Sequence, residues 1–334
     1  MKDQQGTVIY VGKAKSLKKR VQTYFQNTAS HPQKIKKMVA NVDDFDYILT
    51  DTEFEAFMLE CKLIKELKPL FNKRMKSHLS YTYIKIKTDG PYRQVFITPD
   101  REEHDAALYF GPYSSPIYVK KAIENLKEAF HMNCLHPLKG FPCLNYSLGK
   151  CNGLCLGGDA VGQYNAIVDK FIALLQGTDT EILEGLQRKM EQASEEFRFE
   201  RAVKYRNYIK SSSLLIYKES VIHFSEENNN IAVIERLSDQ SVKLFLIKGH
   251  EIIFSEKFAF ENVEQLSKTI RRHFQENAHR ESLTISKGNL DQAQIIYSYL
   301  NSTNARFTII PDHWIESREF AELDVKIREL LMNI

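Results

Sequence analysis

The sequence lacks the features of membrane and secreted proteins. It contains no run of 18 apolar residues, so we expect no membrane-spanning helix and no membrane partner. It also has no basic start followed by an apolar stretch, so we expect no secretory signal. Long internal repeats and low-complexity linkers are absent as well. A cytoplasmic, reducing location is therefore expected, in which the five cysteines do not form a disulfide framework.

The composition that remains is typical of a globular protein. The chain has 334 residues, 43% of them hydrophobic and 27% charged, which is enough for two or three domains. Its charge is unevenly distributed. The first 40 positions carry nine Lys/Arg and one Asp, a local net charge of +8, although the whole chain has only +3. This asymmetry indicates an anionic partner.

Hydrophobic periodicity predicts a mixed α/β fold. A small N-terminal α/β domain is predicted from strands 7–12 and 45–50 and helices 14–25, 33–40 and 52–67, the last with a capping box from Thr52 to Glu55. A second α/β domain is predicted from residue 230 onward. The remaining predicted elements are strands 81–87, 93–98, 231–237, 242–248, 252–260, 283–286 and 306–310, a loop at 109–113, and helices 116–130, 163–176, 262–276, 290–300 and 318–332.

The first predicted turn gathers residue types that phosphodiester cleavage requires. Tyr10 ends the first strand, and Gly12 allows a sharp turn that brings Lys13 to the start of the first helix. Arg20 and Tyr24 share one face of that helix, because they are four residues apart. Tyrosine can act at the nucleophile only if its pKa is lowered, for instance by neighbouring cations.

Glu60 lies at the edge of the apolar face of helix 52–67. A carboxylate in such a site can hold a divalent metal, while a cation neutralises the phosphate charge and a base deprotonates water. On pattern alone, Glu60 is better explained as a boundary residue of its helix. The tyrosines and the arginine are likewise compatible with a solvated or packed face, so the residue set permits a nuclease without identifying one.

The segment from Val8 to Val21 resembles the second half of the GIY-YIG nuclease motif. In particular, it resembles the N-terminal domain of the UvrC family of excinuclease subunits, and the short form called Cho is the most similar in layout. The similarity continues through residues 56–65, 68–72, 83–85 and 109–113. It extends over the cysteine segment and the helices that follow, and it weakens toward the C-terminus.

The resemblance implies a nuclease that cuts one strand of damaged double-stranded DNA 3′ to a lesion, together with UvrB, in nucleotide excision repair. It implies that Glu60 is the single protein ligand of Mg²⁺ or Mn²⁺. Arg20 and Lys13 would handle the scissile phosphate, Tyr10 would lie at the nucleophile with Tyr24 close by, and Asn72 would belong to the same site. The residues expected to hold DNA backbone phosphates are Lys15, Lys18, Lys19, Lys34, Lys36 and Lys37.

The sequence departs from the family pattern at its start. The family motif begins with a strand that carries Gly-x-Tyr before the position of Lys2, so we expect the sheet to lack this strand and its tyrosine. The alternative function is therefore a non-catalytic adaptor that binds UvrB or DNA. A third interpretation is a cysteine–metal nucleic-acid binder unrelated to repair. The sequence also stops at Ile334, before the second nuclease of the family, so we expect no 5′ incision.

Cys134, Cys143, Cys151 and Cys155 form the pattern C-x8-C-x7-C-x3-C. In a reducing compartment this clustering predicts a metal site, the alternative being four independent buried residues. Zn²⁺ and an iron–sulfur cluster both suit four thiolates. The family resemblance implies a [4Fe–4S] cluster, with Zn²⁺ as the alternative. Cys61 is predicted to be a small buried residue.

Residues 179–217 are predicted to form an antiparallel helical hairpin. Composition alone favours a solvated helical pair. The runs 186–190 and 197–202 resemble the UVR motif, which in the family binds a matching hairpin of UvrB, and the expected contacts are Phe197, Phe199 and Arg201. The predicted domains are a nuclease domain at 1–80, a linker region with the cysteine segment at 81–178, the hairpin at 179–217, and an α/β domain of unassigned role at 220–334.

Overall fold

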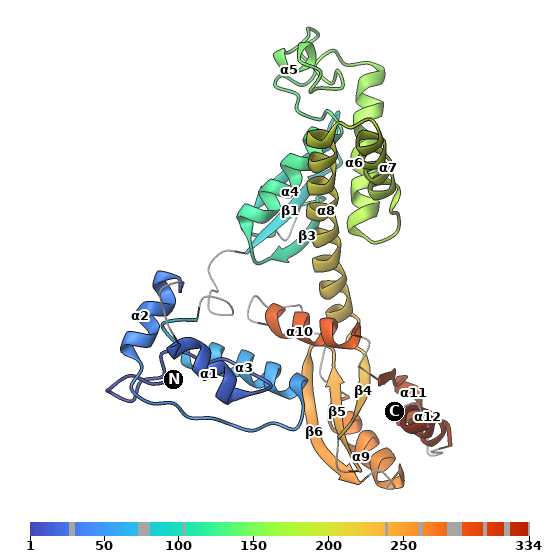
Figure 1. The fold of residues 1–334 in the computed structure, drawn as a ribbon. Helices are drawn as coiled ribbons and strands as arrows, with labels where there is room; N and C mark the ends of the chain where they lie inside the picture. Colours follow the sequence, from blue (N-terminus) through green and yellow to red (C-terminus); the bar gives the residue numbers. More distant parts are fainter. Residues whose placement is uncertain are drawn as a thin grey trace. The chain divides into compact units, whose positions relative to one another are not determined.

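A computed structural model of the chain confirms the mixed α/β fold (Figure 1). It describes residues 1–26, 31–72, 81–102, 105–237, 240–259, 263–278, 289–302, 306–316 and 321–332. The chain divides into two compact units. One is built from residues 1–78 together with 224–334, and the other from residues 79–223.

The helices predicted near the N-terminus are present as α1 (Leu17–Phe25), α2 (Gln33–Asn41) and α3 (Glu53–Leu67). The predicted cap of α3 is confirmed, since the Thr52 hydroxyl accepts a hydrogen bond from the Glu55 amide at 3.1 Å. The Glu55 carboxylate instead accepts from the amide of Asp51 at 2.9 Å, one residue before the expected partner.

The strands predicted at 7–12 and 45–50 are wrong. Among the described residues of this region, Lys2 forms isolated bridges to Val8 on one side and to Asp44 on the other. Val8 lies in the first predicted strand and Asp44 lies just before the second, and each makes one isolated bridge in place of a ladder. Beyond it, the amides of Ile9 and Tyr10 both point to the carbonyl of Met1, at 3.0 and 3.4 Å.

The C-terminal part of the first unit is a sheet of strand order β6-β5-β4-β7, antiparallel throughout. Both faces of its central strands are buried, and the side chains alternate between two cores. Residues such as Ile234 and Leu244 face one core, whereas Ile231 and Phe245 face the other. The strands are β4 (Asn230–Arg236), β5 (Ser241–Lys248), β6 (Glu251–Ala259) and β7 (Arg306–Ile309), and the helices are α9 (Val263–Glu276), α10 (Leu290–Leu300), α11 (Asp312–Glu316) and α12 (Ala321–Met332).

These elements agree with the predicted ones except at two places. The predicted helix 318–332 begins at Ala321 within the described residues and is preceded by the short helix α11. The predicted strand 283–286 lies outside the described residues.

Helix α3 packs directly on this sheet. Phe54 is 2% exposed, and its ring stacks on Tyr299 with centroids 4.0 Å apart and meets Phe245 edge-on at 5.1 Å. The buried ammonium of Lys243 on β5 donates to the carboxylates of Asp51 and Glu55 at 2.7 and 3.0 Å. The N-terminal turn of α3 is therefore held by both apolar and ionic contacts.

Replacing Lys243 by methionine is expected to lower the free energy of unfolding by about 1–2 kcal/mol, because Asp51 and Glu55 lose their shared cation and repel each other. Thermal melting of the full chain measures the effect. The control is Lys268→Met, which removes an exposed partner of Glu264 on α9 and should change stability by less than about 0.5 kcal/mol. Equal melting temperatures for the two variants would contradict a structural role for Lys243.

The second unit contains a three-stranded antiparallel sheet of order β2-β1-β3. Its strands are β1 (Thr82–Lys87), β2 (Gln94–Thr98) and β3 (Leu108–Tyr113). The loop predicted at 109–113 is wrong, because this segment is the edge strand β3. Gly111 and Pro112 suggested a loop, but an edge strand tolerates proline, and the pairing with β1 is irregular between Thr82 and Ile84.

Helices cover this sheet and extend from it. They are α4 (Pro116–Ala129), the short α5 (Leu144–Ser147), α6 (Asp159–Leu175), α7 (Glu181–Glu195) and α8 (Phe199–Glu226). Helices α7 and α8 confirm the predicted hairpin, and its bend falls at Phe197, whose φ is 58°. A single apolar core joins β1, α4, α6, α7 and α8.

Candidate functional sites

The two predicted active-site tyrosines meet beside Arg20. The hydroxyls of Tyr10 and Tyr24 are 3.1 Å apart, and their rings pack edge to face with centroids 5.9 Å apart. Arg20 lies over the Tyr24 ring, with its guanidinium carbon 5.1 Å from the ring centroid. The i, i+4 spacing on α1 produces this contact. One cation and two phenols thus share one corner of the first unit.

Glu60 faces the same corner from helix α3. The backbone of Lys13 and the charges of Lys13 and Arg20 favour the ionised form of its carboxylate. Burial raises the pKa of Glu60 above its usual value, and these groups only partly oppose that effect. The carboxylate is thus half-buried beside two cations.

Lys13 is held by partners that sequence reasoning missed. Its ammonium donates to Glu53 at 2.6 Å and lies 3.2 Å from the centroid of the Phe57 ring. Glu53 also pairs with the exposed Lys15 at 3.0 Å. The signal was present in the sequence, because Glu53 precedes Glu60 by seven residues and therefore lies on the same face of α3.

Asn72 fixes the backbone of the turn. Its side chain accepts from the amide of Val11 at 3.0 Å and donates to the carbonyl of Val11 at 2.9 Å. Gly12 follows immediately, and a Cβ at this position would lie 2.9 Å from the Tyr10 ring. Asn72 and Gly12 therefore act on the position of Tyr10, the first through the backbone and the second by leaving space for the ring.

The pKa of Tyr24 is raised and not lowered. Burial and the hydrogen bond to Tyr10 raise the pKa of Tyr24 to about 12, despite the opposing charge of Arg20. Tyr24 is therefore a neutral phenol near pH 7. The pKa of Arg20 is also raised, because attraction to the two tyrosines outweighs the cost of its burial.

The predicted DNA-contacting lysines lie on the first two helices and the turn before them. Lys18 and Lys19 are exposed on α1, and Lys37 is exposed on α2. Lys34 and Lys36 are half-buried on α2 and have partners of their own. The structure brings the predicted catalytic residues together at one corner, and it distributes these lysines along neighbouring helices.

The four clustered cysteines form a compact group in the second unit. Their sulfur atoms lie within 4.8 Å of one another, and the side chains of Cys143, Cys151 and Cys155 are buried, whereas Cys134 is half-buried. Backbone N–H groups of Leu135 and Tyr146 contribute to lowering the pKa of Cys143 to about 6, with the first of these the largest cause. Cys61 lies apart, buried on α3, as predicted.

This group fits a metal centre. Four thiol sulfurs are a common ligand set for zinc and for iron–sulfur clusters. Zinc bonded to sulfur at about 2.3 Å in a tetrahedron sets the sulfurs roughly 3.8 Å apart, which agrees with the compact grouping. A four-iron cluster gives each thiolate its own iron, so the sulfurs would have to move apart to hold it.

The predicted UvrB contacts are exposed at the hairpin bend. Phe197 and Phe199 are 79% and 60% exposed, and their rings meet edge to face at 6.2 Å. Arg201 is exposed one turn further along α8. Two large apolar side chains beside a cation are left to solvent at this bend.

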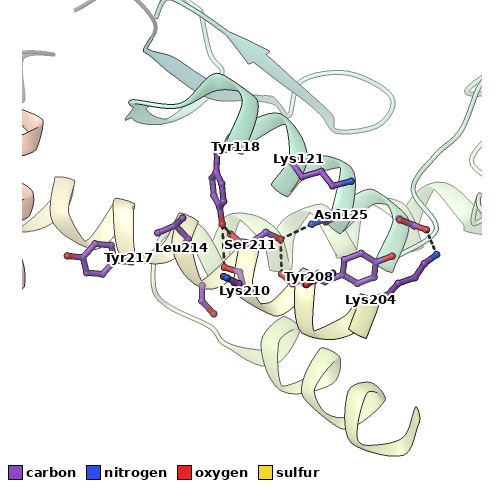
Figure 2. Close-up of a pocket in the computed structure, with 12 residues that line it drawn as sticks. Tyr118, Lys121, Asn125, Lys204, Tyr208, Lys210, Ser211, Leu214 and Tyr217 are labelled. Atoms are coloured by element: carbon purple, nitrogen blue, oxygen red, sulfur yellow. Dashed lines mark hydrogen bonds and ion pairs between the residues drawn. The ribbon is translucent and has the colours of Figure 1, made fainter. Parts of the chain in front are cut away.

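A groove of about 680 Å³ lies between α4 and α8 in the second unit (Figure 2). The residues at its floor bond the two helices to each other. Tyr118 donates to the carbonyl of Ser211 at 3.0 Å, and Asn125 donates to the Ser211 hydroxyl at 3.1 Å. Lys204 spans the groove to Glu128 at 3.1 Å. These contacts explain why α8 packs along α4.

The geometry of the first unit is that of a GIY-YIG type domain, in which tyrosines, an arginine and one helical glutamate converge. The model of the UvrC-like GIY-YIG domain matches residues 1–73. That of the UvrC/Cho excinuclease middle domain matches residues 81–174, and that of the UvrB/uvrC motif matches residues 180–213. The chain belongs to the UvrC family.

Relatives named UvrABC system protein C support this assignment. The one from Acetivibrio thermocellus is 33% identical over 323 residues, covering 93% of this chain and 52% of the relative. That from Caldicellulosiruptor saccharolyticus is 38% identical over 273 residues, covering 80% and 46%. The chain thus spans about half the length of the curated relatives it matches. No solved structure gave a significant match. Within the described residues, no helix is both long and apolar enough to cross a membrane.

Proposed function

We propose that this chain is a DNA endonuclease of nucleotide excision repair, which hydrolyses one strand of damaged double-stranded DNA 3′ to a lesion in concert with UvrB. One observation carries the proposal: Tyr10, Tyr24, Arg20 and the half-buried Glu60 converge on one corner beside Lys13. The test is Mg²⁺-dependent nicking of a lesion-bearing duplex that has been loaded with UvrB. A chain that binds this substrate without cutting it would refute the nuclease assignment.

Glu60 would hold Mg²⁺ or Mn²⁺, which when bound supplies a Lewis acid for the phosphate and lowers the pKa of coordinated water. Arg20 would neutralise charge on the scissile phosphate. Tyr10 would orient the attacking water through its hydroxyl. Tyr24, neutral near pH 7, would donate a hydrogen bond to the Tyr10 hydroxyl. Asn72 holds the turn that carries Tyr10.

Lys13 would have to exchange a partner during binding. Its ammonium is paired with Glu53 at 2.6 Å, and the same carboxylate holds Lys15. A phosphate at this corner would compete with Glu53 for both lysines. Glu53 would then keep the two cations near the site until DNA arrives.

The lysines of α1 and α2 would hold backbone phosphates without reading the sequence. The double variant Lys18→Ala/Lys19→Ala is expected to bind duplex DNA more weakly and to lower the slope of log affinity against log salt by about 2, since each lost phosphate contact removes about 0.9. Fluorescence anisotropy across a salt series measures this slope. The control, Lys268→Ala/Lys326→Ala on α9 and α12, should leave it unchanged. If the α1 double variant and the control double variant gave the same slope, α1 would not contact DNA.

The hairpin of α7 and α8 would bind UvrB through its exposed bend. Phe197→Ser is expected to weaken UvrB binding by about 30-fold, the effect of losing one well-packed aromatic anchor. Titration calorimetry with purified UvrB measures it. Val325→Ser, at a 55% exposed apolar position of α12, is the matched control. Undiminished UvrB affinity of Phe197→Ser would place the contact elsewhere.

The four cysteines would hold a structural metal centre. The resemblance to the UvrC family favours a [4Fe–4S] cluster, and the close grouping of the sulfurs favours Zn²⁺. Metal analysis together with visible absorption separates the two. A broad visible band with iron and sulfide would identify the cluster, and one zinc per chain without such a band would identify zinc.

The second candidate is a non-catalytic adaptor. The observation that favours it is the pairing around residues 7–12, where bridges at Lys2 stand in place of a ladder. A Tyr10 less firmly held by a sheet would be a poorer catalytic group. In this case the chain would bind UvrB and DNA with normal affinity and show no metal-dependent nicking.

A further inference from the structure

The segment around the four cysteines, residues 131–158, is here named the cysteine knob. Between Glu128 and Asp159 the sequence contains no Asp or Glu. The acid-free run is unusual in a chain in which 27% of residues are charged. Lys139 and Lys150 are exposed in it, and His131 is fixed to the carbonyl of Gly149. The charged side chains on its surface are therefore lysines.

The knob also exposes an unusual number of large apolar side chains. Phe141 is 54% exposed and Leu144 is 65% exposed, although both flank the buried Cys143. A small segment that folds around sulfur atoms has little room for an apolar core, so these side chains remain outside. The others that are exposed in the same way are Leu135, Leu138, Tyr146, Leu148 and Leu156.

The fold holds these residues in place. The amide of Leu138 donates to the carbonyl of Leu154 at 3.1 Å, and the amide of Gly140 donates to the carbonyl of Cys155 at 2.9 Å. The side chain of Asn145 donates to the carbonyl of Asn133 at 2.6 Å. A pre-ordered backbone loses little further entropy on binding, so the side chains that it carries are suited to insertion.

Exposed aromatic and aliphatic side chains beside lysines, with no carboxylate among them, match the chemistry of a nucleic acid with unstacked bases. Bases stack on aromatic rings in single strands, and apolar wedges enter between base pairs of a distorted duplex. Lysines beside them meet the flanking phosphates.

We propose that the cysteine knob is a second DNA contact, in which Phe141 and Leu144 pack against unstacked bases of a locally opened duplex while Lys139 and Lys150 bind the adjacent phosphates. The proposal rests on the proposed function only in taking DNA as the partner. It needs neither cleavage nor the lysines of α1 and α2.

The test compares binding of the full chain to a fully paired duplex and to the same duplex with a short central bubble, by fluorescence anisotropy. Phe141→Ser/Leu144→Ser is expected to weaken bubble binding by about 10-fold or more and paired-duplex binding by less. Lys139→Ala/Lys150→Ala should weaken both and lower the salt slope by about 2. The matched controls are Ile117→Ser, at an 84% exposed apolar position on α4, and Lys120→Ala, an exposed lysine of the same helix.

Metal content is measured for each variant, so that a disrupted knob is recognised. If Phe141→Ser/Leu144→Ser loses its metal, the lysine variant alone decides. Unchanged bubble affinity in the variants that keep their metal overturns the proposal, and so does a loss of UvrB affinity without a loss of DNA affinity. A chain that binds the bubble through the knob but never nicks refutes the nuclease and leaves the knob intact. If the chain nicks normally and the knob variants bind the bubble as tightly as wild type, the knob proposal is refuted and the nuclease proposal stands.

Discussion

Glu60→Gln is expected to reduce Mg²⁺-dependent nicking of UvrB-loaded, lesion-bearing DNA by about 100- to 1,000-fold, while DNA affinity stays within about twofold. The substitution removes the charge that would hold the metal but keeps the size of the side chain. The loss should fall mainly on the rate of cutting, because we assign binding of the phosphate backbone to the lysines of α1 and α2. Single-turnover cleavage assays at saturating protein measure it.

Glu66→Gln is the matched control for this experiment. Glu66 is an exposed carboxylate near the end of the same helix, so its replacement makes the same change in charge away from the site. If Glu60→Gln nicked at the wild-type rate, Glu60 would have no catalytic role. Absence of nicking by the unsubstituted chain, together with normal UvrB binding, would support the adaptor instead.

Cys151→Ser is expected to release the bound metal and to lower the stability of the second unit by about 3 kcal/mol or more, since metal binding and folding of such a segment are coupled. For a domain of this size that corresponds to a drop in Tm of roughly 6–12 °C. The sulfur of Cys151 accepts from the amide of Gly153 at 3.4 Å, and Met132 bridges to Cys151 on the edge of the knob. Metal analysis and calorimetry of the full chain provide the readouts.

Cys61→Ser serves as the control for cysteine chemistry. It changes a buried cysteine of α3 that takes no part in the cluster, so metal content should be unchanged and the loss of stability should be about 1 kcal/mol. If Cys151→Ser retained full metal, the four sulfurs would not form a single centre. Loss of a visible absorption band with the metal would mark the centre as an iron–sulfur cluster.

The sequence was most informative where one local signal decided the structure. Helix α3 follows from its Thr52 cap, and the predicted hairpin at 179–217 is present with its bend at Phe197. The alternation in β4 and β5 predicted strands, and the structure adds that these strands separate two cores. The proximity of Arg20 and Tyr24 followed from helical spacing alone.

The features that depend on distant partners were not predictable in this way. Residues 7–12 have a strand-like sequence, yet a strand needs a paired neighbour, and Lys2 provides only single bridges. Strand β3 was hidden by Gly111 and Pro112, which an edge position tolerates. The burial of Lys243 between Asp51 and Glu55 arises from residues 192 and 188 positions apart, and no local pattern reports such a contact.

That separation has a consequence for how the chain is made. Residues 79–223 form a unit that is contiguous in sequence, so this unit can fold as soon as it leaves the ribosome. The first unit cannot fold that early, because Phe54 packs against Phe245 and Tyr299, which are synthesised much later. At about 5–20 residues per second, the 192 positions between Asp51 and Lys243 correspond to roughly 10–40 s. During that interval the Phe54 side chain, on the helix that carries Glu60, is without its apolar partners and available to chaperones or to aggregation.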